Sequence, residues 1–327
     1  MTASPSIFLV GPTASGKSAV ALALAERLGG EIISVDSMQV YRGLDLGTAK
    51  PSAAERARVS HHLIDVVELT APFDAAKFME LARRAEADIR GRGRAPIFCG
   101  GTGLYFKAYL EGLGAAPPSD AAVRQQLEAT PLAELLRELE QRDPVTYGRI
   151  DRQNPRRVVR ALEVIRLTGR PFSQQRAAWP PLPTQCAIPE TGARIFGLNR
   201  APEDLHARIH ARVDEMFARG LLDETRELLK HGLEQNPTAL QAIGYRQVVE
   251  HLRGARPLAD TIELVKIKTR QFAKRQMTWF RRQLSVEWIP VEAQDEVHAV
   301  AQRVSGLAAN GTRTRPTPSP SRRPRAP

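Results

Sequence analysis

An eight-residue segment near the start of the chain, Gly11–Ser18, fits the phosphate-loop pattern G-x-x-x-x-G-K-[ST] at every fixed position. It follows the apolar run Ile7–Val10 and precedes the helix-forming segment Ala19–Leu28. A strand that ends at Val10 delivers such a loop to the start of a helix, where successive backbone N–H groups point at phosphate oxygens. The segment therefore predicts a core of fold class α/β that binds a nucleotide or another diphosphate.

The fixed residues of the loop each have a chemical reason. Gly11 and Gly16 allow the tight backbone path, and Lys17 brings a positive charge to the distal phosphates. The Ser18 hydroxyl is a ligand for Mg²⁺, the cofactor that we expect. We predict phosphate contacts along the whole loop, at Gly11, Pro12, Thr13, Ala14, Ser15, Gly16, Lys17 and Ser18.

Two further apolar runs lead into polar or glycine residues. Ile32–Val35 stops at Asp36, and Ala95–Cys99 runs into the Gly-rich turn Gly100–Tyr105. Parallel sheets hold their ligands beyond the carboxyl ends of the strands, so Asp36 and Thr102 are predicted to border one crevice with the loop. A carboxylate there serves as a general base or holds a metal; a turn with no catalytic function is the alternative at both places.

The middle of the chain carries helix signals and few strand signals. Helices are predicted at about 120–128, 131–142 and 156–167, and Pro-rich segments flank them at 114–118 and at Trp179–Pro189. The strand Arg194–Leu198 then returns to the sheet. We predict a P-loop NTPase-like parallel sheet core at 1–116, an inserted all-helical domain at 117–189, the second part of the core with C-terminal helices at 190–310, and a disordered basic tail at 311–327.

Two later segments have helical periodicity. In Glu203–Ala218, four apolar residues recur at helix spacing and are predicted to face a core, namely Ile209, Val213, Met216 and Phe217. In Leu264–Leu284, three basic residues recur four apart beside aromatic residues, namely Lys266, Arg270 and Lys274. The pattern predicts a basic stripe, and its aromatics belong more naturally to a core than to a platform for bases.

The charge balance favours an RNA partner. Lys and Arg number 47 against 36 Asp and Glu, which gives a formal net charge of +11 and a pI of about 10.1. Segment 311–327 holds five arginines and no acid, so the rest of the chain retains +6 of the +11. The tail either adds sequence-independent attraction to RNA or is inert.

Cysteine usage and hydropathy indicate the cytoplasm. Cys99 and Cys186 are the two cysteines, too few for a disulfide framework or a four-cysteine zinc site. No apolar stretch approaches the roughly 20 residues that span a bilayer, and the N-terminus lacks the pattern of a secretion signal. We expect a cytoplasmic monomer that does not engage membranes.

Five motifs occur in the order found in one enzyme family. They are GPTASGKS at 11–18, VDSMQVYRGLDLGTAKP at 35–51, HHLID at 61–65, GGTGLY at 100–105 and QFAKRQMTWFR at 271–281. Together they resemble the tRNA dimethylallyltransferases, also called tRNA isopentenyltransferases. Eukaryotic members add a C-terminal zinc finger, and its absence here points to the bacterial type.

The resemblance implies a reaction without nucleotide hydrolysis, in which a dimethylallyl group passes from its diphosphate to N6 of the adenosine 3′ of a tRNA anticodon. The loop would hold the diphosphate leaving group, with Lys17 and Mg²⁺ stabilising its charge. Asp36 would accept the N6 proton, and the Thr13 hydroxyl would contact the bridging oxygen. A second cationic ligand is expected on the helix 203–218, at Arg212 in preference to Arg208.

The resemblance also implies where tRNA is held, because the target base must leave its stack to enter a buried channel. It assigns tRNA contacts to Asp36, Ser37, Met38, Gln39, Thr102, Arg124, Arg156, Arg157, Val158, Val159, Arg160, Gln241, Ala242, Ile243, Gly244, Tyr245 and Arg246. Gln and Asp side chains offer hydrogen bonds to base edges, Arg binds phosphate, and Tyr245 can stack on a base. For the arginines at 156–160 the alternative is a solvated helix face.

Three other functions compete with this one. An adenylate isopentenyltransferase shares the loop and the aspartate but acts on free AMP, ADP or ATP, and needs no RNA-binding surface. A P-loop kinase or NTPase would turn over ATP, whereas a tRNA prenyltransferase hydrolyses little or none. A noncatalytic RNA-binding protein leaves the intact G-K-S and Asp36 unexplained.

Overall fold

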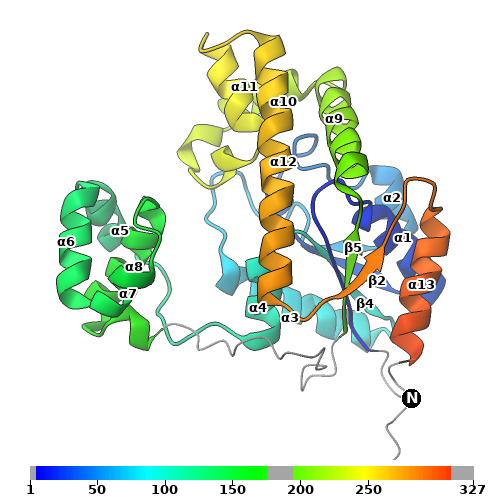
Figure 1. Ribbon diagram of the computed structural model, residues 1–327, viewed down its shortest axis with the longest axis horizontal. Helices are drawn as coiled ribbons and strands as arrows, with labels where there is room; N and C mark the ends of the chain where they lie inside the picture. Colours follow the sequence, from blue (N-terminus) through cyan, green and yellow to red (C-terminus); the bar gives the residue numbers. More distant parts are fainter. Residues whose placement is uncertain (1–4, 176–193, 311–327) are drawn as a thin grey trace, which may run out of the picture. The chain divides into compact units, whose positions relative to one another are not determined.

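The computed structural model describes residues 5–175 and 194–310 (Figure 1). The predicted linker Trp179–Pro189, Cys186 and the predicted tail 311–327 lie outside the described residues. The chain separates into two compact units, which comprise the described residues within 1–73, 81–103 and 183–327, and within 74–80 and 104–182. Across the described part of the chain, every helix is too short or too polar to cross a membrane.

The first unit is built on a six-stranded sheet in which all paired strands run parallel. The strand order is β3-β2-β4-β1-β5-β6. The strands are β1 (Ile7–Val10), β2 (Glu31–Val35), β3 (His61–His62), β4 (Pro96–Gly100), β5 (Arg194–Asn199) and β6 (Glu287–Pro290). The sheet confirms the predicted α/β class, and it adds two edge strands, β3 and β6, that the sequence analysis did not predict.

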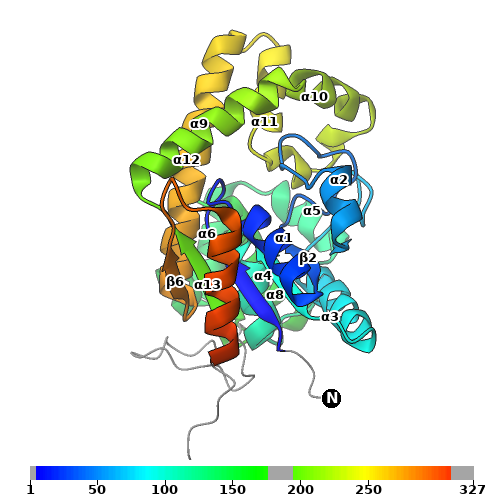
Figure 2. The same ribbon diagram turned by 90° about the vertical axis from the view of Figure 1, so that its right-hand side faces the viewer.

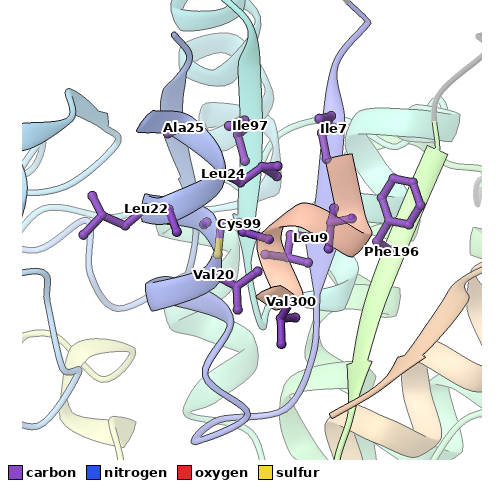
Figure 3. Close-up of a cluster of buried hydrophobic side chains, with 14 of the residues drawn as sticks. Ile7, Leu9, Val20, Leu22, Leu24, Ala25, Ile97, Cys99, Phe196 and Val300 are labelled. Carbon is purple, nitrogen blue, oxygen red and sulfur yellow. The ribbon is translucent and has the colours of Figure 1, made fainter. Parts of the chain in front are cut away.

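The core packs on both faces of the central strand β1. Leu9 is in register with Cys99 of β4 and Phe196 of β5, and all three are buried on the face covered by helices α1 (Lys17–Leu28) and α13 (Val297–Asn310) (Figure 3). Figure 2 looks toward these two helices, which pack side by side. On the opposite face Phe8 stacks on Phe98 with ring centroids 4.6 Å apart, as the alternation of side chains along a strand requires.

Helix α1 begins two residues earlier than the predicted Ala19. Gly16 precedes it with φ 90°, a left-handed value that glycine adopts without steric cost, so Lys17 and Ser18 belong to the first turn. The helix ends at Gly29, also left-handed, whose N–H bonds to the carbonyl of Ala25. Lys17 and Ser18, the two polar residues of the G-K-S sequence, therefore lie where the loop joins the helix.

The remaining helices of the first unit lie between β2 and β6 in the sequence. They are α2 (Ala53–Arg58), α9 (Pro202–Ala218), α10 (Leu221–Lys230), α11 (Tyr245–Leu252) and α12 (Leu258–Gln283), with short 3₁₀ turns at η2 (Leu233–Gln235) and η3 (Ala239–Gln241). Helix α3 (Ala75–Gly91) contributes its later residues here and its first residues to the other unit. Ile209 and Val213 of α9 pack in one cluster with Val265 and Ala273 of α12, which confirms the predicted core face of α9 at these two positions. Phe217 packs against the same cluster and Met216 does not.

The second unit is helical throughout its described residues outside the turns. It contains α4 (Gly103–Glu111), α5 (Ala121–Glu128), α6 (Leu132–Arg142), α7 (Pro144–Arg149), α8 (Pro155–Thr168) and the 3₁₀ turn η1 (Phe172–Gln174). Helix α8 packs against α5 and α6 through Val158, Leu162 and Ile165. Buried Glu163 accepts hydrogen bonds from the backbone N–H of Asp120 (3.0 Å) and from Arg160 (2.7 Å), which fixes the start of α5 on α8.

Candidate active site

The phosphate loop lies at the carboxyl end of β1 and is tightly wound. The N–H of Ser15 and the Nζ of Lys17 both donate to the carbonyl of Pro12, at 3.3 and 3.1 Å. Ala14 adopts φ 62°, a value uncommon for a residue with a side chain. The Ser15 hydroxyl is fully buried and has no hydrogen-bond partner among the described residues. A phosphate oxygen inside the loop would satisfy this hydroxyl.

Two arginines hold the loop from its outer side. The Nε of Arg208 donates to the carbonyl of Ala14 at 3.0 Å, and the Nε of Arg200 donates to the carbonyl of Ser15 at 2.9 Å. Arg200 is itself held by Asp204, 2.7 Å away. Because the trans peptide points C=O and N–H in opposite directions, fixing these carbonyls keeps the N–H groups of Ser15 and Gly16 on the other side of the loop, where the N–H of Ser15 donates to Pro12.

Three charged side chains from the loop, from the end of β2 and from α9 interact electrostatically. Burial lowers the pKa of Lys17, the cation of Arg212 lowers it further, and Asp36 is among the groups that raise it. Burial likewise lowers the pKa of Arg212, and the carboxylate of Asp36 partly offsets this. Two cations and one carboxylate therefore lie within electrostatic reach of one another at the end of the sheet.

The structure distinguishes Arg212 from Arg208. Arg208 uses its Nε on the loop backbone, and burial together with neighbouring Arg200 lowers its pKa. Arg212 has no hydrogen bond or ion pair with any residue in the described ranges, and it lines a cavity of about 740 Å³. The cavity lies between segment 45–57 and the end of α9, and its walls are Asp45, Leu46, Ala49, Lys50, Pro51, Ser52, Ala53, Arg56, Ala57, Asp65, Arg212, Glu215, Met216 and Arg219.

The other cations of this cavity have carboxylate partners. Lys50 pairs with Asp45 at 2.7 Å, Arg56 with Asp65 at 2.8 Å, and Arg219 with Glu215 at 3.4 Å. Since Arg212 has no such partner within the described part of the chain, its guanidinium is the cation of this wall that is free to bind an anionic ligand.

Asp36 and Thr102 meet at the carboxyl ends of adjacent strands β2 and β4. One carboxylate oxygen of Asp36 accepts from the N–H of Met38 at 2.8 Å and of Gln39 at 3.3 Å. The Thr102 hydroxyl accepts from the N–H of Ser37 at 3.1 Å, and the Thr102 N–H donates to the carbonyl of Val35 at 3.2 Å. The geometry brings together the two residues predicted to share a crevice, and it holds the carboxylate of Asp36 in one orientation.

The side chain of Gln39 is used by the protein itself. Its oxygen accepts from the Ser34 hydroxyl at 2.9 Å, and its nitrogen donates to the carbonyls of Thr48 and Ala49 at 3.1 and 3.2 Å. Gln39 therefore anchors the wall of the cavity, which leaves Ser37 and Met38, both partly exposed, as the side chains next to Asp36 that a ligand can reach.

The structure corrects the expectation that Tyr245 stacks on a base. Its ring is fully buried and lies where a side chain on Gly47 would be, because a Cβ at that glycine would come within 2.5 Å of the ring. The Tyr245 hydroxyl donates to Glu224 at 2.5 Å and accepts from the N–H of Gly47 at 3.1 Å. Tyr245 therefore locks segment 45–48 in place, while Gln241 and Arg246 of the same predicted stretch are exposed.

The predicted tRNA-binding arginines of the second unit differ in what they already contact. Arg160 bonds to Glu163 and to the carbonyl of Pro117. Arg124 bonds to Glu128 at 3.1 Å and to Ser119 at 3.0 Å. Arg156 and Arg157 are exposed at the start of α8. Burial, followed by the charge of Arg124, lowers the pKa of Arg156, so these two cations lie near each other.

Two valines in the predicted tRNA-binding stretch are core residues. Val158 and Val159 belong to the hydrophobic cluster of the second unit and are 0% and 3% exposed. Their side chains cannot contact tRNA in this structure, which corrects the expectation at those two positions.

The basic stripe predicted on α12 is partly neutralised. Lys266 pairs with Asp214 at 2.8 Å and with Glu263 at 2.9 Å, and Arg270 contacts the Nε2 of His210. Phe280 is fully buried, as the core interpretation of the aromatics predicts, whereas Phe272 is 38% exposed and departs from it. Of the three predicted basic residues, Lys274 is the exposed one.

Two residues that the sequence analysis missed contact the loop directly. Arg200 bonds to Ser15 as described above. Gln276, in the middle of the motif QFAKRQMTWFR, accepts from the N–H of Thr13 at 2.9 Å. No local pattern distinguishes either residue from its neighbours; only the presence of Gln276 inside a recognised motif pointed to it.

The residues of the phosphate loop fit a metal ion that binds together with a diphosphate ligand. The described residues contain no group of three or more His, Cys, Asp or Glu side chains that could hold a metal ion. Ser18 is exposed at the start of α1, and its hydroxyl makes no hydrogen bond to the described residues. Mg²⁺ typically takes one or two protein ligands, substrate phosphates and several waters, so Ser18 with a diphosphate suffices.

Comparisons with known proteins agree on one family. The sequence profile described as IPP transferase matches residues 39–283. A tRNA dimethylallyltransferase of Geobacter metallireducens is 47% identical over 289 residues, which cover 86% of this chain and 91% of that protein. One from Geobacillus kaustophilus is 44% identical over 306 residues, which cover 92% and 95%.

Solved structures give the same result. A tRNA isopentenylpyrophosphate transferase from Bacillus halodurans matches with a TM-score of 0.67 and 36% identity, over 94% of this chain and 98% of that one. A eukaryotic dimethylallyltransferase acting on tRNA matches with a TM-score of 0.74 and 26% identity, over 94% and 80%. These matches confirm the resemblance drawn from the five motifs.

Proposed function

The chain belongs to the IPP transferase family, and on that premise we propose that it transfers the dimethylallyl group of dimethylallyl diphosphate to N6 of the adenosine 3′ of the anticodon in tRNA. The product is N6-isopentenyladenosine. The observation that carries the proposal is the placement of Asp36 within electrostatic reach of Lys17 and Arg212 at the phosphate loop. One site thereby offers a base to the acceptor and cations to the leaving group.

The phosphate loop is proposed to bind the diphosphate of the donor. The donors proposed for it are the backbone N–H groups at the start of α1, which have no partner within a helix, together with the ammonium of Lys17 and the guanidinium of Arg212. As the allylic C–O bond breaks, charge accumulates on the diphosphate oxygens, and fixed donors and cations stabilise that charge more than they stabilise the bound donor. The hydroxyl of Thr13, a residue of the same loop, is proposed to contact the bridging oxygen.

Asp36 is proposed to act on the acceptor. One of its oxygens is held by the N–H groups of Met38 and Gln39, which leaves the other for the exocyclic amine. N6 attacks the allylic carbon, the new C–N bond forms as the C–O bond breaks, and the bonding electrons leave with the diphosphate. The N6 proton passes to the Asp36 carboxylate, which makes the weakly nucleophilic amine productive.

We propose that Ser18 and the diphosphate hold Mg²⁺. When bound, the ion would supply further charge neutralisation to the leaving group. The residues of the chain that orient the diphosphate, namely the loop amides, Lys17 and Arg212, act on the same oxygens and do not depend on a separate carboxylate cluster.

The tRNA is proposed to contact both units. Ser37, Met38 and Thr102 lie beside Asp36 and would meet the extruded adenosine. Exposed Gln241 and Arg246 of the first unit and exposed Arg156 and Arg157 of the second are suited to the RNA backbone. The positive charge that remains outside segment 311–327 supports such a partner.

A label-transfer experiment tests the function directly. The protein is incubated with radiolabelled dimethylallyl diphosphate and either total tRNA or AMP, with ATP turnover followed in parallel. We expect label on tRNA, none on AMP and no ATP hydrolysis above background. Label on AMP would indicate an adenylate isopentenyltransferase, and rapid ATP turnover would indicate an NTPase.

A further inference from the structure

A single buried amide on α12 bridges two segments of the active site. The side-chain oxygen of Gln276 accepts from the N–H of Thr13 in the phosphate loop at 2.9 Å, and its nitrogen donates to the carbonyl of Gly101 at 2.9 Å. The residue is 7% exposed. Thr13 and Gly101 lie in loops that follow neighbouring strands, β1 and β4, so this one side chain spans the two loop ends.

Gly101 and Gly103 lie where side chains of α12 leave no room for a Cβ. A Cβ at Gly101 would come within 2.3 Å of the Gln276 nitrogen, and one at Gly103 within 2.1 Å of the Trp279 ring. Gln276 and Trp279 are three residues apart and lie on one face of α12. The two glycines on either side of Thr102 thus let the turn lie directly against α12.

The bonds continue from the turn to the catalytic carboxylate. Thr102, next to Gly101, accepts from the N–H of Ser37 at 3.1 Å and donates its own N–H to Val35 at 3.2 Å. Asp36 lies between Val35 and Ser37. The path from the phosphate loop to the proposed base therefore runs through Gln276, the turn and the backbone on both sides of Asp36.

From this path we infer that Gln276 is a positioning residue, which sets the spacing between the diphosphate in the loop and the carboxylate of Asp36. The inference rests on the proposed function, and it gives Gln276 no direct contact with the diphosphate donor or with tRNA. It predicts a defect in the transfer step and little change in the binding of the diphosphate, because Arg200 and Arg208 still hold the loop from outside.

Glutamine suits this bridge because one side chain must both accept and donate. Leucine fills a similar volume and does neither, so the Thr13 N–H and the Gly101 carbonyl both lose a buried partner. An ionised glutamate at this position can accept a hydrogen bond from the Thr13 N–H, but it has no proton to donate to the Gly101 carbonyl. Once protonated, the introduced carboxyl has the same donor and acceptor pattern as glutamine. The glutamate variant can thus be switched by pH, and the leucine variant cannot.

The experiment compares Gln276→Leu, Gln276→Glu and the control Thr261→Val. Thr261 is a fully buried residue of the same helix whose hydroxyl bonds to Pro257 at 2.9 Å. It lies about 22 Å along α12 from Gln276 at 1.5 Å per residue. Each variant is measured for folded fraction by circular dichroism, for affinity for inorganic pyrophosphate, and for single-turnover transfer to tRNA at saturating substrates from pH 6 to pH 8.

We expect Gln276→Leu to slow transfer by about ten- to a hundredfold at every pH, with pyrophosphate affinity within about threefold of wild type. For Gln276→Glu we expect the rate relative to wild type to rise as the pH falls, because the introduced carboxyl takes up a proton. Dividing by the wild-type rate at each pH removes every pH effect that the variant shares with wild type. Thr261→Val should transfer at the wild-type rate once corrected for folded fraction.

Hydrogen exchange gives a measurement that does not require activity. Gln276→Leu should speed amide exchange by about tenfold in both segments 11–18 and 101–103, whereas Thr261→Val should leave both unchanged. The inference is overturned if folded Gln276→Leu transfers at the wild-type rate and keeps wild-type amide exchange in both segments. It is also overturned if Thr261→Val shows the same slow transfer and fast exchange that we expect of Gln276→Leu. A wild-type protein that labels no tRNA would refute the proposed function alone, and the exchange comparison would still decide the bridge.

Discussion

Arg208 donates a hydrogen bond from its Nε to the carbonyl oxygen of Ala14, 3.0 Å away, and so belongs to the outer support of the phosphate loop. Arg212 lies one helical turn further along α9, interacts electrostatically with Lys17 and Asp36, and has no hydrogen bond in the described part of the chain. Two arginines that are alike in sequence therefore have different surroundings, and they should respond differently to replacement.

Arg212→Ala should weaken pyrophosphate binding and slow transfer on the order of a hundredfold or more, because a cation that meets the developing charge is lost. Arg208→Ala should slow transfer less, since Arg200 and the Pro12 carbonyl still hold the loop. Isothermal titration with pyrophosphate and single-turnover assays of both variants measure the difference. Equal losses in the two variants would place Arg208 on the ligand as well.

Asp36→Asn should slow transfer on the order of a hundred- to ten-thousandfold and leave donor binding close to wild type. The amide keeps an oxygen for the N–H groups of Met38 and Gln39, so the turn is preserved while the proton acceptor is removed. Single-turnover rates with preformed donor complex test this, with pyrophosphate affinity as the control. A near-normal rate would remove Asp36 from the mechanism.

Cys99 gives a prediction for stability against pH. Burial raises the pKa of the Cys99 thiol from 9.0 to about 11, an effect that Lys17 opposes and Asp36 reinforces. Above pH 9 the unfolded chain releases this proton while the native protein keeps it, so the free energy of unfolding falls as the pH rises toward 11. The expected loss is about 2 to 3 kcal/mol.

Urea unfolding of wild type and Cys99→Ala at pH 8, 9 and 10.5 measures the effect. The alanine variant carries a constant offset from the smaller side chain, and its stability should decline less steeply across this range. Parallel curves for the two proteins would show that the thiol is not the group responsible.

Arg157→Ala should weaken tRNA binding and lower the slope of log affinity against log salt by roughly 0.7 to 0.9, if one phosphate contact is lost. Arg157 is exposed, and its side chain makes no hydrogen bond or ion pair in the described part of the chain, so we expect its replacement to leave the fold intact. Arg160→Ala is less informative, because Arg160 also holds Glu163 and Pro117.

A chain truncated after residue 310 is the matched control for Arg157, since it removes five arginines without touching the helical unit. If the truncation alone abolished the salt dependence while Arg157→Ala bound normally, the second unit would not be the RNA-binding surface proposed here.

The central features of the fold could be predicted because their signals are local. The apolar run Ile7–Val10, the glycines of the loop and the helix after it occupy consecutive residues. The edge strands β3 and β6 are two and four residues long, and they form by pairing with β2 and β5, which no local pattern reports. The strands and helices that carry the site were thus accessible from the sequence, and the sheet edges were not.

The roles of single side chains depended on distant residues. Tyr245 is withdrawn from solvent because Glu224 and Gly47 meet its hydroxyl, and neither is near it in the sequence. Gln276 acts on Thr13, which is 263 residues away. Arg208 and Arg212 lie on one helix with one spacing, so only the position of the phosphate loop against α9 distinguishes them.

The position of β1 in the sheet has a consequence for synthesis of the chain. Its neighbours are β4, which ends at Gly100, and β5, which begins at Arg194. As the polypeptide leaves the ribosome, the strand that carries the phosphate loop lacks one of its two partners until the whole helical insertion has been made. The short-range contacts of that insertion form quickly, whereas pairings between distant strands form slowly. A nascent chain halted before residue 194 should therefore expose one edge of β1 and depend on chaperones at that stage.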